Sequence, residues 1–93
     1  MSKLYPDVFK KPLSVSDVRT AATVIVQSKR PSMYTLQRKM GMGAGKAMVM
    51  IRLLEDAGII TELTKQRPDR SVILRSEPAA VNAALRQLRK GNA

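Results

Sequence analysis

Residues 32–60 read SMYTLQRKMGMGAGKAMVMIRLLEDAGII, and their pattern predicts two helices joined by a turn. The serine that opens it follows a proline and is a helix-capping residue type, so residues 32–40 are expected to form a helix. Residues 41–43, Gly-Met-Gly, interrupt the helical pattern because glycine adopts backbone angles that other residues resist. A second helix is expected over residues 44–57, ended by Gly58 in the left-handed conformation. Two short helices joined by a glycine turn are typical of a helix-turn-helix, whose second helix can enter a DNA major groove.

The composition favours a nucleic-acid-binding protein and argues against an enzyme. Seventeen Lys and Arg against seven Asp and Glu give a net charge of +10 in 93 residues, and the excess is spread along the whole chain. Such an excess is the electrostatic signature of a nucleic-acid binder. Cysteine and histidine are both absent, which removes thiolate chemistry and the commonest general base and metal ligand. We therefore expect no catalysis, no metal and no cofactor.

The glycine run before Lys46 does not predict a nucleotide site. A phosphate loop needs a glycine five residues before its Gly-Lys pair and Ser or Thr directly after it, where this chain has Met40 and Ala47. The third glycine also comes one residue early for a dinucleotide-binding fingerprint. No apolar run resembles a signal peptide or a membrane span, so we expect a cytoplasmic, nucleoid-associated protein with no membrane partner.

The flanking segments complete the expected architecture. Residues 1–13 form a basic arm, and a first helix begins near Ser14 and ends around Ser28. The β-branched residues 59–64 and 71–75 are expected to pair as a hairpin with a basic tip. A last helix is expected to begin after Ser76 and to end at Gly91. The apolar residues expected to face the core are Val18, Ala21, Ala22 and Ile25 in the first helix and Val81, Ala84, Leu85 and Leu88 in the last helix.

The predicted fold class is mainly α with a small β-hairpin, a winged helix-turn-helix with an additional C-terminal helix. The expected organisation is an arm over residues 1–13, the DNA-binding domain over 14–76 and the last helix over 77–93. The narrow apolar stripe of that last helix suits either folding back on its own domain or pairing with a second copy.

The candidate DNA-contacting residues fall into three groups, according to the element that carries them. Residues of the second helix expected to face the groove are Ala44, Gly45, Lys46, Met48, Val49 and Arg52. Residues of the preceding helix and turn expected to contact phosphates are Ser32, Tyr34, Gln37, Arg38, Lys39 and Gly43. Cations at the hairpin tip expected to contact the backbone or a minor groove are Lys65, Arg67 and Arg70.

Residues 31–61 resemble the gamma domain of the FtsK-type DNA translocases. The likeness lies in Leu36-Gln37-Arg38-Lys39-Met40, Gly43, Lys46-Ala47, Ile51 and Glu55-Asp56-Ala57-Gly58-Ile59-Ile60. The resemblance implies a winged-helix scaffold that binds duplex DNA. It implies no translocation, because 93 residues hold no ATPase motor. Ala44, Gly45 and Lys46 stand where that family typically has an aromatic residue, an asparagine and an arginine, so its target sequence does not carry over.

The expected function is sequence-specific binding of double-stranded DNA, by a small plasmid- or phage-type transcriptional repressor that works as a dimer or side by side on repeated sites. An alternative is a protein that organises or partitions DNA through repeated sites. Two further classes stay open. One is RNA or ribosome binding, and the other is a protein-interaction module with Val49, Met48 and Leu53 as its docking patch.

Overall fold

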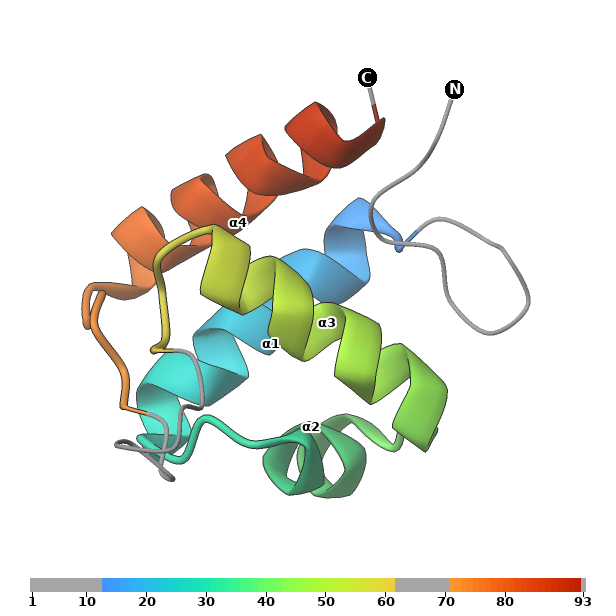
Figure 1. Cartoon of the computed structure of the whole chain (residues 1–93). Helices are drawn as coiled ribbons and strands as arrows, with labels where there is room; N and C mark the ends of the chain where they lie inside the picture. Colours follow the sequence, from blue (N-terminus) through green and yellow to red (C-terminus); the bar gives the residue numbers. More distant parts are fainter. Residues whose placement is uncertain (1–12, 62–70, 93) are drawn as a thin grey trace.

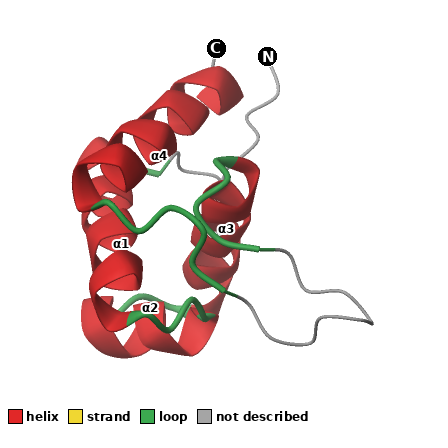
Figure 2. Cartoon of the chain, turned by 90° about the vertical axis from the view of Figure 1, so that its left-hand side faces the viewer, coloured by secondary structure: helices red, strands yellow, loops and turns green. Residues whose placement is uncertain are grey.

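The computed structural model describes residues 13–61 and 71–92, which contain four α-helices and no strand. The helices are α1 (Val15–Ser28), α2 (Met33–Met40), α3 (Ala44–Asp56) and α4 (Glu77–Asn92). Figure 1 shows α1 and α4 side by side and antiparallel, and α3 crosses in front of α1. The short helix α2 lies at the opposite end of the molecule from α4. Seen from the side, α3 lies against the layer formed by α1 and α4 and contacts both helices (Figure 2).

Local capping signals set the helix ends, as predicted. The Ser14 hydroxyl accepts a hydrogen bond of 3.1 Å from the amide of Asp17, and the Ser32 hydroxyl accepts one of 3.2 Å from the amide of Thr35. These bonds satisfy amides that the first turn of a helix leaves without partners. Gly41 ends α2 at a φ of 68°, a left-handed conformation that glycine adopts without a steric penalty.

The end of α3 is fixed by a Schellman motif around Gly58. Gly58 has a φ of 78°, its amide donates to the Glu55 carbonyl, and the amide of Ile59 donates to the Leu54 carbonyl, both at 3.0 Å. The expected end of α3 is thereby confirmed to within one residue. In α4 the prediction was wrong at Gly91, because the helix continues through this residue to Asn92.

The hydrophobic core lies between α1 and the three other helices. The predicted stripe of α1 is buried in full, joined by Val26, and α4 contributes the fully buried Ala80 and Ala84 with Leu88. Alanines on the facing sides of α1 and α4 leave room for the two helices to approach closely. Ala80, which the sequence did not point to, takes the buried place expected of Val81 and Leu85, both of which are half-exposed. The apolar stripe of α4 therefore packs against α1 of the same chain.

The predicted β-hairpin is wrong, and with it the winged-helix fold class. Ile60 and Val72 form one isolated antiparallel bridge, and no strand grows from it in the described residues. A strand points successive side chains to opposite faces, but Ile59 and Ile60 are both buried in the core. The Ile59 carbonyl accepts from the amides of both Ile73 and Leu74, which departs from the regular spacing of a ladder. Lys65, Arg67 and Arg70, the expected hairpin tip, lie outside the described residues, as do residues 1–12 of the expected arm.

Candidate nucleic-acid interface

The outward face of α3 presents small, apolar and basic side chains. Ala44, Met48 and Arg52 are exposed, and their spacing of four residues places them on one face of the helix. Met48 is 61% exposed, which is unusual for a large apolar residue and marks a surface suited to contact. Gly45 and Val49 are half-exposed beside them. Five of the six residues that we expected to face the groove, all but Lys46, therefore lie together on the outward side of α3.

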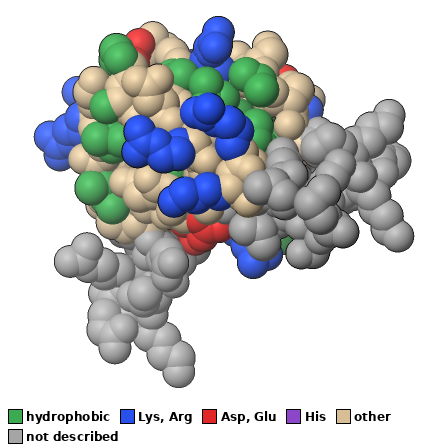
Figure 3. Space-filling view, turned by 90° about the horizontal axis from the view of Figure 1, so that it is seen from above, with side chains coloured by type: hydrophobic (Ala, Val, Ile, Leu, Met, Phe, Trp, Pro, Cys, Tyr) green, Lys and Arg blue, Asp and Glu red, His purple; other side chains and the backbone are tan. Residues whose placement is uncertain are grey.

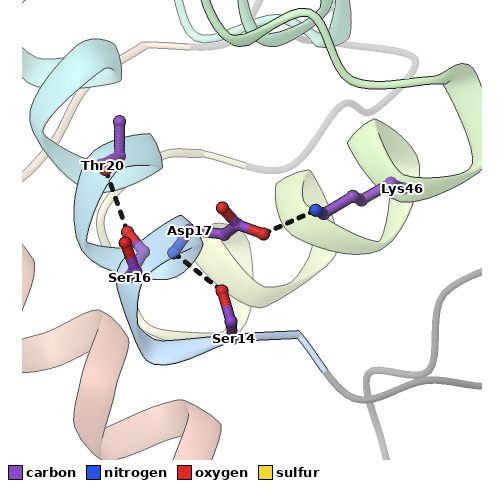
Figure 4. Close-up of polar contacts among 5 residues, drawn as sticks. All are labelled: Ser14, Ser16, Asp17, Thr20 and Lys46. Carbon is purple, nitrogen blue, oxygen red and sulfur yellow. Dashed lines mark hydrogen bonds and ion pairs between the residues drawn. The ribbon is translucent and has the colours of Figure 1, made fainter.

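Lys46 is engaged with another helix instead of being free on that surface. Its ammonium donates a hydrogen bond of 2.5 Å to the Asp17 carboxylate on α1, and the two side chains are 33% and 36% exposed (Figure 4). The hydrogen bond from Lys46 lowers the pKa of the Asp17 carboxyl, helped by the attraction of the lysine charge and opposed by partial burial. The pair thus ties the first turn of α3 to the first turn of α1.

The start of α3 is sterically open. Gly43 occupies the position before the helix, is exposed, and makes no side-chain cap. Its φ of −72° suits any residue, and a side-chain carbon added there meets no atom within 4 Å. Neither the backbone nor the packing of the described residues therefore requires glycine at this position, in contrast to Gly41.

A group of cations surrounds the connection between α1 and α2. Two surface hollows of about 520 and 460 Å³ flank it, the first lined by Lys29 and Arg75 and the second by Arg30, Arg38 and Lys39. The other residues that the structure shows lining the hollows are neutral, so no acidic group offsets these charges there. We call these five cations the basic junction.

Tyr34 and Arg38 are arranged against each other within the second hollow. The Arg38 guanidinium donates a hydrogen bond of 3.2 Å to the Tyr34 hydroxyl, and its central carbon lies 5.8 Å from the centre of the ring. The distance to the ring centre fits a cation held against an aromatic face, and the hydrogen bond to the hydroxyl fixes the guanidinium at the edge of the ring. Tyr34 is 64% exposed and Arg38 is exposed as well, so the stacked pair is open to a ligand.

The remaining phosphate candidates are placed unequally. Lys39 is exposed and Gln37 is half-exposed on α2, whereas the Ser32 hydroxyl is occupied by its capping bond and lies 3.1 Å from the Thr35 hydroxyl. Sequence reasoning missed Lys29, Arg30 and Arg75. The adjacent basic pair before Pro31 was a signal for the first two, but nothing in the sequence places Arg75 beside them.

The protein-docking patch expected on α3 is contradicted at Leu53. Leu53 is fully buried in the core and Val49 packs partly against it, which leaves Met48 as the exposed member of the three. In the described part of the chain, no group of three acidic side chains is placed to hold a metal ion. None of its helices is long and apolar enough to cross a membrane.

Comparison with protein-family models, with curated proteins and with solved structures gives no significant match to this chain. The resemblance of residues 31–61 to the FtsK-type gamma domain stays a prediction.

Proposed function

We propose that this protein binds double-stranded DNA through the α2–turn–α3 unit and acts as a small transcriptional regulator. Two surfaces carry the proposal together, the exposed face of α3 and the basic junction. Among the described residues that line the basic junction, none is acidic. DNA presents a dense row of phosphates beside grooves that admit a helix, so it satisfies both surfaces at once.

The outward face of α3 supplies the base contacts in this proposal. Arg52 can donate to a guanine edge or a phosphate, and Met48 can pack against a thymine methyl group. Glycine at position 43 and alanine at position 44 keep side chains away from the front of α3, so the backbone there can approach a phosphate closely. An external partner at this point accounts for a glycine that the described fold itself does not require.

The basic junction supplies the phosphate contacts. Its cations come from the end of α1, from α2 and from the segment before α4, so they form a broad surface instead of a single row. Stacking against Tyr34 restricts the Arg38 side chain before DNA arrives, which lowers the entropic cost of the contact. Contacts of this kind fix the protein on the duplex without reading its sequence.

Lys46 takes a structural role in this proposal instead of the base contact expected from sequence. Its bond to Asp17 holds the front of α3 against α1, which sets the direction in which α3 enters the groove. Arg52 then remains as the cation exposed along α3 itself. One arginine and one methionine read few base pairs, so side-by-side binding on repeated sites or dimerisation is required for useful specificity.

The test compares Arg52→Ala with Arg38→Ala. A preferred duplex is first selected from a random library, and affinities for it and for a scrambled duplex are measured by fluorescence anisotropy. Arg52→Ala should weaken binding to the preferred duplex by about 1–3 kcal/mol and spare the scrambled duplex. Arg38→Ala should weaken both equally, and Arg19→Ala, an exposed cation on α1, serves as the control for loss of one charge.

Three results would overturn the proposal. Selection that yields no preferred duplex would reduce the interaction to charge attraction. Equal losses on both duplexes for Arg52→Ala would remove α3 from base reading. Tighter binding to a structured RNA than to any duplex would reassign the surface to RNA.

A further inference from the structure

The outer side of α4 carries a second group of cations. Arg86, Arg89 and Lys90 are all exposed, and their spacing places them on neighbouring positions of one helical surface. Figure 3 shows the molecule from the α4 side, where Lys and Arg side chains gather on the surface. We call Arg86, Arg89 and Lys90 the α4 cations.

This group is separate from the basic junction. Within the described residues α2 contacts α1 and α3 but not α4, and the two helices lie at opposite ends of the molecule (Figure 1). α3 does contact α4, but the α4 cations lie towards the carboxyl end of that helix, away from α2 (Figure 1). We therefore treat them as a surface separate from the one proposed for the first duplex.

The helix dipole explains only part of this charge. Cations in the last turn of a helix are stabilised by its carbonyl end, which applies to Arg89 and Lys90. Arg86 stands before the last turn and gains little from that effect. The acidic residue of α4, Glu77, is nine residues from Arg86, or about two and a half turns. The surface is thus complementary to a polyanion.

A duplex suits this surface better than a lipid membrane. An interfacial helix must insert an apolar face into the lipid, but the apolar stripe of α4 packs against α1. The large hydrophobic side chains that are exposed in the described residues, Val15, Tyr34, Met48 and Ile73, all lie outside α4.

We infer that the α4 cations bind the phosphate backbone of a second duplex, so that one chain bridges two DNA segments. The inference rests on the proposed function for the first duplex and adds a DNA-joining activity to it. The second contact reads no sequence, since it consists of cations against phosphates. A regulator built in this way holds a distant or neighbouring segment at the site that it occupies.

The test is a capture assay in which the preferred duplex is fixed to beads and a fluorescent scrambled duplex is free in solution. The variant Arg86→Gln/Arg89→Gln/Lys90→Gln should bind a single preferred duplex within about twofold of the parent and capture at least about tenfold less free duplex, because three phosphate contacts are lost. The control Arg86→Lys/Arg89→Lys/Lys90→Arg keeps all three charges and should capture like the parent.

Each other outcome overturns the inference in a distinguishable way. Unchanged capture by the glutamine variant leaves the α4 cations without a role in bridging. Loss of single-duplex binding together with capture assigns them to the first duplex. Sedimentation showing a dimeric parent and a monomeric variant makes α4 a protein–protein interface, and stronger retention on phosphatidylserine vesicles than on DNA makes it a membrane surface. A parent with no preferred duplex is instead a failure of the proposed function, and single-duplex binding reports it separately.

Discussion

Replacing Arg38 and Lys39 together should change the salt dependence of DNA binding by a calculable amount. Each phosphate neutralised by a cation contributes about −0.9 to the slope of log K against log salt concentration on duplex DNA. If all five cations of the basic junction contact phosphates, they contribute about −4.5 to the slope of the parent. Arg38→Ala/Lys39→Ala should therefore make the slope shallower by about 1.8.

The assay titrates the preferred duplex by anisotropy at five salt concentrations between about 50 and 300 mM. The matched control is Arg86→Gln/Arg89→Gln, which removes the same charge from the other end of the molecule and should leave the single-duplex slope unchanged. Circular dichroism confirms that both variants keep their helices. A slope for Arg38→Ala/Lys39→Ala equal to that of the parent would show that this part of the basic junction does not face the duplex, and the orientation proposed for the α2–turn–α3 unit would fail.

Four further predictions concern the core, the turn between α2 and α3, and the ion pair. Leu53→Ala should lower the free energy of unfolding in urea by about 2–5 kcal/mol because the side chain is fully buried, and a change below about 1 kcal/mol would contradict that packing. Gly41→Ala should cost about 1–2 kcal/mol through its left-handed backbone. Gly43→Ser supplies the missing cap and should stabilise by a few tenths of a kcal/mol while weakening duplex binding, so unchanged affinity would remove the front of α3 from the interface. The pKa of Asp17 is lower in the folded chain than in the unfolded one, so its stabilisation is present above the unfolded value near about 4 and lost as pH falls through the folded value. Asp17→Asn should therefore reduce stability by about 0.2–1 kcal/mol at neutral pH, and the gap to the parent should narrow in urea titrations as the pH is lowered below the unfolded value.

The helices were predictable from sequence because the signals that set them are local. Ser14 and Ser32 bond amides three residues away, and Gly41 and Gly58 end helices through their own backbone angles. None of these contacts depends on the tertiary fold. The sequence also identified most of the α3 face, because the spacing of apolar residues fixes which side is buried.

The errors arose where distant residues decide the outcome. A run of β-branched residues predicted a strand from Ile59 onward, but burial of two consecutive side chains in a helical core took precedence over that propensity. Lys46 looked like a base-reading residue because its partner, Asp17, is 29 positions away. Arg75 joins Lys29 at one hollow only after the chain has passed through α3 and returned.

The ion pair between Lys46 and Asp17 limits how the protein could distinguish one DNA sequence from another in the proposed complex. If Lys46 were free, α3 would offer two cations to the groove, at its front and at its middle. With Lys46 held by α1, Arg52 is the cation that α3 exposes, and most other cations of the described residues belong to the basic junction and the α4 cations, for which we propose phosphate contacts. Phosphate contacts raise affinity for every sequence equally, so a single bound chain discriminates poorly between sites. In the proposed mode of binding, selectivity must then come from several chains bound together on repeated sites, because each added chain brings its own α3 contacts. The phosphate contact proposed for α4 becomes intramolecular once the first duplex is bound, and it adds affinity without adding selectivity.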